Sequence, residues 1–392
     1  MFTREIYPEL IRALEVKQII AITGMRRVGK TTAVKYLLKE VLNKNKIYLD
    51  LERVEHRILF RQDNYQHIVK SLEYEGIDFS KKAWIAIDEI QLVPEIASVI
   101  KFLYDTYDIK FLVTGSSSYY LKNLFSESLA GRKRIYELWP LSFGEFLQFT
   151  EPREAFLVEE PFIPYNRQVS GKLKEAYRQY LVYGGFPEVV LCKTEEDKRF
   201  LLNDIINSYL NLDIQILSDF RKVDDIYKVI KLLTARVGSK TDFTKLSGIT
   251  GINRQTLKEY LLFFEQTYLI LQVPAYVKNA DREIALQKKL YFSDNGILNT
   301  LGSAGSGAIL ENSIASQLRR RGEIKYYARR SGQEIDFILN EQIAFEVKET
   351  PSPYDMKVLQ QRAEQIGISQ FKLIGLEQTN PDFTNFVWAG NV

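Results

Sequence analysis

The sequence predicts an α/β protein of more than one domain, with a parallel sheet at its N-terminal end and a smaller α/β domain at its C-terminal end. The length supports several domains, because 392 residues exceed the usual size of a single core. Residues 16–23 are apolar and β-branched, as in a buried parallel strand, and apolar residues recur at helical spacing over 31–43. Short strand patterns separated by helical ones return in the last hundred residues, which predicts the second α/β unit.

Composition excludes several kinds of site. The single cysteine, Cys192, excludes intramolecular disulfides and cysteine-based zinc modules, which need several thiolates. The two histidines, His56 and His67, exclude multi-histidine metal sites and argue against a histidine-based catalytic triad. We therefore expect any metal ion to be bound by oxygen. No secretory leader or membrane-spanning stretch is recognisable, so we expect a cytoplasmic protein without a membrane partner.

A glycine-rich loop after the first strand predicts a phosphate-binding site. Residues 24–31 read GMRRVGKT and match G-x-x-x-x-G-K-[ST] between a strand and a helix. In such a loop, backbone N–H groups and the helix dipole bind phosphate oxygens, the lysine reaches the outer phosphates and the last hydroxyl ligates Mg²⁺. Two arginines inside the loop either contact phosphates or are solvated. The predicted nucleotide-binding residues are Gly24, Arg26, Arg27, Val28, Gly29, Lys30, Thr31, Thr32 and Ser116.

Two acids end the next apolar run, and they supply what a triphosphate hydrolase needs beside the phosphate loop. We expect Asp88 to hold Mg²⁺ together with Thr31, and Glu89 to polarise the attacking water as general base. The strand at 109–113 is followed by small hydroxyl residues. Thr114 or Ser116 suits a γ-phosphate sensor, and the alternative is an ordinary turn.

Arg132 follows the next helical pattern and has two interpretations. It either reaches the nucleotide of an adjacent subunit in a homo-oligomer, as a trans arginine finger, or belongs to a surface basic cluster with Lys133 and Arg134.

The motifs GMRRVGKTT, IAIDEIQ, TGSSS and LAGR, followed by PLSFGEF at 140–146 and YGGFP at 183–187, resemble a large prokaryotic family of AAA+ ATPases. In that family a P-loop module is fused to a C-terminal domain, and the likeness covers essentially the whole chain. The resemblance implies ATP binding and hydrolysis on a five-stranded parallel P-loop NTPase sheet of the AAA+/ASCE type, with Mg²⁺ as cofactor. The chain departs from AAA+ proteins in lacking a clear sensor-2 arginine, for which Arg178 is the candidate.

The middle of the chain predicts a helical lid and a winged helix. Residues 151–168 contain three prolines and are linker-like, and helical periodicity continues through 217. Three helical patterns at 226–237, 241–247 and 253–268 precede two extended runs at 269–277 and 284–292, the order of a winged helix. Such modules bind DNA or dock proteins. The predicted DNA contacts are Arg254 and Gln255 on the third helix, with Lys278 and Arg282 on the wing.

The C-terminal domain carries a candidate metal site. Asp336, Glu346 and Lys348, on adjacent predicted strands, resemble the PD-(D/E)XK nuclease superfamily, with Glu311 on the preceding helix. The resemblance implies a metal held by the three acids and catalytic roles for Asp336, Glu346 and Lys348. The alternative is cross-strand ion pairs on a solvated face. Between residues 278 and 330, ten Lys/Arg stand against five Asp/Glu, which suits a phosphate backbone. The predicted contacts are Arg319, Arg320, Arg329 and Arg330.

Together these patterns predict four regions and two functional hypotheses. The regions are a P-loop core at 1–150, a linker and lid at 151–218, a winged helix at 219–292 and a nuclease-like domain at 293–392. The first hypothesis is ATP hydrolysis coupled to binding or processing of nucleic acid, with DNA favoured. The second is an ATP-switched regulatory protein whose nuclease-like domain is non-catalytic and recognises DNA or a protein partner.

Overall fold

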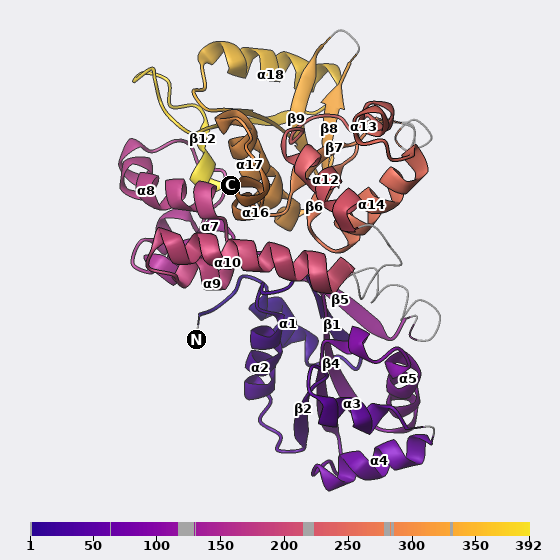
Figure 1. The fold of residues 1–392 in the computed structure, drawn as a ribbon. Helices are drawn as coiled ribbons and strands as arrows, with labels where there is room; N and C mark the ends of the chain where they lie inside the picture. Colours follow the sequence, from indigo (N-terminus) through magenta and orange to yellow (C-terminus); the bar gives the residue numbers. More distant parts are fainter. Residues whose placement is uncertain are drawn as a thin grey trace.

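The computed structural model describes residues 2–62, 64–116, 129, 131–214, 223–277, 283, 286–329 and 332–392. Figure 1 shows two parts stacked along the long axis of the molecule: an N-terminal sheet with its helices, and a C-terminal part that contains the last sheet. Helix α10 (Glu195–Ser208) runs across the junction between them. No helix within the described residues has the length and apolar character needed to cross a bilayer.

The N-terminal part confirms the predicted five-stranded parallel sheet. Its strand order is β2-β3-β4-β1-β5, and every neighbouring pair is parallel. The three central strands are apolar and almost wholly buried, as their sequences require for a sheet covered on both faces. The elements are α1 (Tyr7–Ala13), β1 (Ile19–Thr23), α2 (Lys30–Glu40), β2 (Lys46–Asp50), α3 (Val54–Phe60), α4 (Tyr65–Tyr74), β3 (Ala83–Asp88), η1 (Ile90–Leu92), α5 (Ile96–Thr106), β4 (Ile109–Gly115) and β5 (Lys133–Glu137).

The segment after the sheet is helical, but its first part is not a free linker. Phe162 donates its N–H to the carbonyl oxygen of Asn391 at 2.8 Å, and Tyr165 donates to the carbonyl oxygen of Phe386 at 2.7 Å. Residues 162–165 therefore lie against the last residues of the chain, from which they are far apart in sequence. The elements here are α7 (Phe143–Thr150), η2 (Ala155–Val158), α8 (Arg167–Tyr183), α9 (Pro187–Leu191), α10 and η3 (Tyr209–Asp213).

Three helices and a two-stranded antiparallel ribbon follow, at the positions that the sequence predicts. The helices are α12 (Val223–Thr234), α13 (Phe243–Thr250) and α14 (Arg254–Gln266), and the strands are β6 (Ile270–Val273) and β7 (Lys289–Phe292). The predicted wing residues Lys278 and Arg282 lie outside the described residues.

The C-terminal sheet has the order β12-β11-β10-β9-β8 and mixes parallel and antiparallel pairs. The alternation predicted for β10 is confirmed, because Phe345 and Val347 pack in one apolar cluster and Ala344 in another. The short strand β12 was not predicted. The elements are α16 (Asn295–Leu301), α17 (Ser306–Arg321), β8 (Ile324–Ala328), β9 (Glu334–Leu339), β10 (Ile343–Lys348), α18 (Pro353–Gln365), β11 (Gln370–Gly375), β12 (Val387–Trp388) and η4 (Ala389–Asn391).

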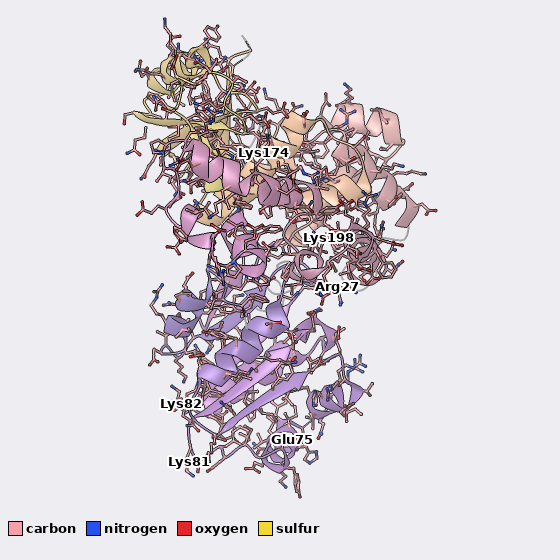
Figure 2. The ribbon with its side chains drawn as sticks, turned by 90° about the vertical axis from the view of Figure 1, so that its left-hand side faces the viewer. Arg27, Glu75, Lys81, Lys82, Lys174 and Lys198 are labelled. Carbon is pink, nitrogen blue, oxygen red and sulfur yellow. The ribbon has the colours of Figure 1, made fainter. Side chains whose placement is uncertain are left out.

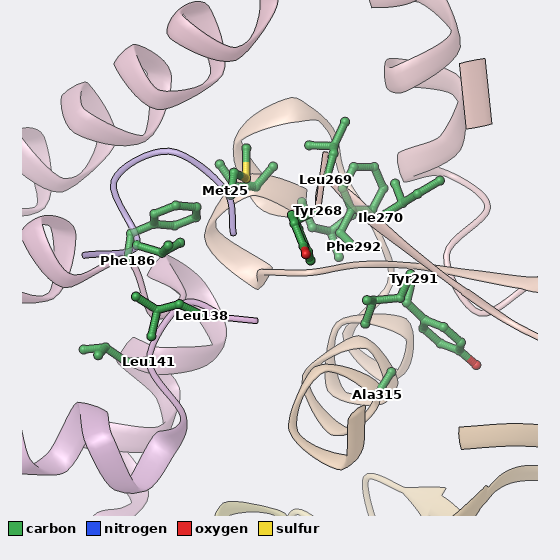
Figure 3. Close-up of a cluster of buried hydrophobic side chains, with 14 of the residues drawn as sticks. Met25, Leu138, Leu141, Phe186, Tyr268, Leu269, Ile270, Tyr291, Phe292 and Ala315 are labelled. Carbon is green, nitrogen blue, oxygen red and sulfur yellow. The ribbon is translucent and has the colours of Figure 1, made fainter. Parts of the chain in front are cut away.

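One apolar cluster crosses the boundaries that the sequence predicts between domains. It includes Met25 of the phosphate loop, Leu138 and Leu141 after β5, and Tyr268 and Phe292 of the C-terminal part. Figure 3 shows these side chains in one close-up, with Phe186 of the YGGFP motif among them. The two parts therefore share a core.

The two signature motifs meet at this junction. The N–H of Leu141 donates to the carbonyl oxygen of Gly185 at 2.6 Å, and the N–H of Gly185 donates to Asp294 Oδ2 at 2.7 Å. A Cβ on Gly185 would lie 2.3 Å from the carbonyl oxygen of Leu141, so only glycine fits. Glu145, 2% exposed, forms a capping box with Ser142 and an ion pair with Arg4 at 2.8 Å.

Candidate functional site

The phosphate loop has the backbone that its glycines permit. Gly24 has a φ of 151°, and a Cβ there would lie 2.1 Å from the carbonyl oxygen of Leu138. Gly29 has a φ of 99° and precedes α2. The Lys30 side chain is buried, and its Nζ donates to the carbonyl oxygens of Gly24 at 3.0 Å and Met25 at 3.1 Å. The ammonium group therefore lies inside the loop, at the start of the helix.

Asp88 is surrounded by hydroxyl groups. Thr31 Oγ1 donates to its Oδ2 at 2.6 Å, Tyr48 donates to the same oxygen at 2.7 Å, and Thr114 Oγ1 donates to Oδ1. Burial and the neighbouring carboxylate raise the pKa of Tyr48 above its usual value, so this phenol stays protonated as a donor. Thr31 and Asp88 form an all-oxygen pair, which fits the ligand preference of Mg²⁺.

Glu89 lies between the loop lysine and the end of β4. Its backbone has a φ of 56°, a left-handed conformation that is uncommon outside glycine and frequent at functional sites. Its N–H donates to Thr114 Oγ1 at 2.9 Å, and its Oε1 lies 3.7 Å from Lys30 Nζ. The structure thus brings together Lys30, Thr31, Asp88 and Glu89, as the sequence predicts.

The two sensor candidates occupy different positions beside these acids. Thr114 bridges Asp88 and the backbone of Glu89. Ser116 is 2% exposed and accepts a hydrogen bond from Gln91 Nε2 at 3.1 Å. Gln91 also donates to Glu89 Oε2. Sequence reasoning gave no role to Gln91, although this residue ends the IAIDEIQ motif, or to Tyr48, which lies outside the quoted motifs.

The two loop arginines point to acids of the protein. Arg26 Nη1 lies 3.6 Å from Glu52 Oε1. Arg27, in a left-handed backbone conformation, donates to Asp204 of α10 at 2.5 Å and lies 3.8 Å from Glu188 of α9. Figure 2 labels Arg27 at the junction of the two parts. In this structure Arg27 therefore links the loop to α10 and α9.

Arg132 and Arg178, the arginine-finger and sensor-2 candidates, form ion pairs with nearby acids. Arg132 Nε lies 3.0 Å from Asp105 Oδ1 on the surface of the same chain. Arg178, the sensor-2 candidate, is exposed and pairs with Glu175 at 2.7 Å within α8. Val28 is buried, and Thr32 follows Thr31 in the first turn of α2.

The C-terminal acids are arranged differently from the prediction. Lys289 of β7, 4% exposed, places its Nζ 3.3 Å from Glu311, 2.5 Å from Glu334 and 3.7 Å from Asp336. These carboxylates raise the pKa of Lys289 despite its burial, so the side chain stays charged. An ammonium group therefore lies among the acids that were expected to bind a metal ion. Tyr291 of the same strand donates to Glu311 at 2.6 Å.

The other acid of the predicted metal site also has protein cations beside it. Lys348 Nζ donates to Glu346 Oε1 at 2.8 Å, and Arg362 Nη1 lies 3.8 Å from the same oxygen. Burial, with Asp336 nearby, raises the pKa of Glu346 to about 7. Asp336 Oδ2 accepts a hydrogen bond from the N–H of Val347 at 2.9 Å. Within the described ranges, no group of three or more His, Cys, Asp or Glu residues is placed to hold a metal ion. In this structure the acids of the predicted metal site are therefore paired with lysines of the chain.

The predicted nucleic-acid contacts divide into two groups. Arg254 and Gln255 are exposed in the first turn of α14, where the prediction places them. Arg319 and Arg320 instead line a cavity of about 570 Å³ at the junction of the two parts. Arg319 lies 3.5 Å from Glu137, and Arg320 lies 3.8 Å from Glu145 and donates to the carbonyl oxygen of Pro140. These two were predicted for DNA and are bound by the chain itself; Arg329 is exposed, and Arg330 lies outside the described residues.

Comparison with known proteins divides the chain into three matched regions. Residues 16–147 match the model of a family described as an AAA domain. Residues 174–308 and 306–389 match two families described as domains of unknown function, DUF8612 and DUF4143.

Two similar proteins come from an archaeon and a bacterium. Uncharacterized protein MJ1544 of Methanocaldococcus jannaschii is 26% identical over 386 residues, which cover 92% of this chain and 83% of that protein. An uncharacterized protein of Haemophilus influenzae is 26% identical over 376 residues, covering 91% and 90%.

Solved structures are more distant. The Walker-type ATPase PABY2304 of Pyrococcus abyssi has a TM-score of 0.47 at 17% identity, over 77% of this chain and 96% of that chain. The Aeropyrum pernix ORC1 protein in complex with DNA has a TM-score of 0.33 at 12% identity, over 81% and 94%. Residues 16–147 form an AAA-type P-loop domain. Both the family match and the parallel sheet with its phosphate loop support this assignment.

Proposed function

We propose that this protein binds ATP with Mg²⁺ and hydrolyses it. The observation that carries the proposal is the meeting of Lys30, Thr31, Asp88 and Glu89 at the carboxyl ends of β1 and β3. A phosphate chain bound to the loop amides draws the Lys30 ammonium to its outer oxygens. Glu89 then accepts a proton from the attacking water, while Thr114 fixes the backbone of Glu89.

Thr31 and Asp88 are the residues that would hold Mg²⁺. The ion, when bound, neutralises charge on the phosphate oxygens. In the structure Thr31 and Asp88 hydrogen-bond each other directly at 2.6 Å, so the two side chains that would hold the ion already lie side by side. Tyr48 and Thr114 donate to Asp88 and orient its carboxylate.

Two variants test the proposal. Lys30→Ala should abolish ATP binding and turnover, because Lys30 supplies the buried ammonium that lies against the loop carbonyl oxygens of Gly24 and Met25. Glu89→Gln should bind ATP normally and lose turnover by about a hundredfold or more. Nucleotide binding by fluorescence and phosphate release by a coupled assay separate the two effects. Full turnover in either variant contradicts the assigned roles.

Arg27 supports coupling of the nucleotide to the helical segment. It sits inside the loop and is bound to α10 and α9, so a phosphate that attracts the guanidinium competes with Asp204 and Glu188. Protease protection of α10 should therefore change on ATP addition in the wild type and not in Asp204→Ala. Arg132 would serve an adjacent subunit as a trans finger in a homo-oligomer, and Arg132→Ala should then lower turnover only where the protein assembles.

A second proposal concerns the C-terminal part: it is a non-catalytic recognition platform. Lys289 carries this proposal, because its ammonium lies among the acids of the nuclease-like site. Plasmid and branched DNA incubated with protein and Mg²⁺ or Mn²⁺ should remain intact. Cleavage that disappears in Asp336→Ala would instead establish a nuclease.

The partner that we propose for this platform is DNA, read by the first turn of α14. Arg254 and Gln255 are exposed on α14, the helix before the ribbon, and the described contact of Gln255 is a hydrogen bond to Glu259 of the same helix. Arg254→Ala should weaken DNA binding and reduce its salt dependence, whereas Arg178→Ala, an exposed arginine on another helix, should not. A salt-independent affinity would contradict phosphate contact.

A further inference from the structure

A buried glutamine lies directly beside Glu89, the predicted general base of the phosphate site. Gln91 is in η1, two residues after Glu89, and is only 5% exposed. Its Nε2 donates to Glu89 Oε2 and, at 3.1 Å, to Ser116 Oγ. A carboxylate has no proton to donate, so the atom that faces Glu89 is the amide nitrogen and not the oxygen. The orientation of the Gln91 amide is thus fixed by chemistry.

The placement is costly for the fold. Gln91 follows Ile90 and precedes Val93, which are fully buried in the apolar cluster on this face of the sheet. Its Oε1 is buried and accepts no hydrogen bond from the described residues. A buried polar atom without a partner costs about 1–3 kcal/mol. An apolar side chain would avoid that cost, so the stability of the fold does not explain a glutamine here.

The two oxygens of Glu89 have different neighbours. Oε1 faces Lys30 Nζ at 3.7 Å, and Oε2 accepts from Gln91. A triphosphate in the loop attracts the Lys30 ammonium towards its outer oxygens, which weakens the first contact at the moment when Glu89 must act. The Gln91 amide is then what holds the carboxylate in place, and it ties that carboxylate to Ser116 at the end of β4.

We propose that Gln91 is a positioning residue for ATP hydrolysis, which orients the Glu89 carboxylate towards the attacking water and couples it to Ser116. The proposal rests on the ATPase function proposed above. It assigns to Gln91 an effect on turnover without an effect on nucleotide affinity, because none of its described contacts reaches the phosphate loop.

The test is Gln91→Met, which keeps the length of the side chain and removes both N–H donors. The turnover number should fall about tenfold or more, with the dissociation constant for ATP within about twofold of wild type. Gln317→Met is the matched control, since Gln317 is 3% exposed, also has a buried amide atom without a partner among the described residues, and lies at the junction near Phe143. Gln317→Met should leave the turnover number unchanged.

A second measurement separates positioning from packing. In a Glu89→Asp background the acid is one methylene shorter and cannot span from Lys30 to Gln91, yet it remains an acid, so residual turnover is measurable. If Gln91 acts through Glu89, Gln91→Met should cost less than about twofold in that background. An equal loss in both backgrounds, or a loss shared by Gln317→Met, overturns the inference. Should Gln91→Met fail to fold, Gln91→Leu also removes the donors without adding a charge and serves the same comparison.

The outcomes for the two proposals are distinct. A wild-type protein that binds ATP and releases no phosphate contradicts the proposed function itself. A wild-type protein that turns over ATP, with Gln91→Met equally active, contradicts only the role of Gln91.

Discussion

Two clusters of acids within the described residues, one at the phosphate loop and one in the C-terminal sheet, differ in the cations beside them. At the phosphate loop, Asp88 is contacted by three hydroxyl groups, and Glu89 faces a lysine that also belongs to the loop. In the C-terminal part, the acids around Asp336 are matched by Lys289, Lys348 and Arg362. In the contacts described, the first cluster sets two acids against one lysine, and the metal ion that we propose would complete its charge balance. The charge of the second cluster is balanced by lysine and arginine side chains of the chain itself. We therefore expect similar residue types to bind ligands in the first cluster and to stabilise the fold in the second.

The largest expected effect comes from removing the internal cation of the second cluster. Lys289→Met leaves Glu311, Glu334 and Asp336 without their shared ammonium, and it should lower the free energy of unfolding by about 3–5 kcal/mol. Chemical denaturation measures this. Millimolar Mn²⁺ should partly restore the stability of this variant and leave the wild type unchanged. Wild-type stabilisation by Mn²⁺ alone, without nucleotide, would show that the second cluster binds metal after all.

Protonation of Glu346 should change the free energy of unfolding by an amount on the order of 3 kcal/mol. Its pKa is about 7 in the folded protein and 4.5 in the unfolded reference, so the folded state binds more protons between these values. The contribution of Glu346 to stability is therefore present at low pH and is lost as the pH rises from about 4.5 to 7. Subtracting the unfolding free energy of Glu346→Gln from that of the wild type at each pH should show this decline. A flat difference would mean that Glu346 is fully ionised throughout.

Nucleotide bound at the phosphate loop should raise the free energy of unfolding of the protein by a slightly smaller amount. At a ligand concentration of about one hundred times the dissociation constant, ligand binding adds about 2.7 kcal/mol to the unfolding free energy. We expect this for Mg²⁺ with ATP in Glu89→Gln, where turnover does not consume the ligand. Lys30→Ala should show no such gain, and a gain in that variant would place the ligand elsewhere.

The smallest effect should come from Tyr48, which touches Asp88 from the neighbouring strand β2. Tyr48→Phe removes one hydrogen bond and keeps the ring, so it should cost about 1 kcal/mol of stability. We also expect a higher Mg²⁺ requirement for turnover, because Asp88 loses one of the groups that orient it. Thr31→Ala, which removes a metal ligand, should raise that requirement much further.

The individual helices and strands were easier to predict from the sequence than the contacts between them. Strong periodicity and the loop pattern predicted the parallel sheet, the three helices with their ribbon and most of the last sheet, along with Lys30, Thr31, Asp88 and Glu89. Lys289 could not be found this way, because its partners lie on other elements and no spacing connects residue 289 to residues 311, 334 and 336. The same holds for Arg319 and Arg320, whose run of charge resembles a DNA-binding surface until the fold places acids beside it.

The shared apolar cluster has a practical consequence for anyone dividing the chain. A fragment ending at residue 150 would leave Leu138, Leu141 and Phe143 facing water, although all three are at most 3% exposed in the intact protein. Such a fragment would also lose Asp204, the acid that holds Arg27. Isolated expression of the first 150 residues should therefore give aggregates, and biochemistry on this protein calls for the uncut chain.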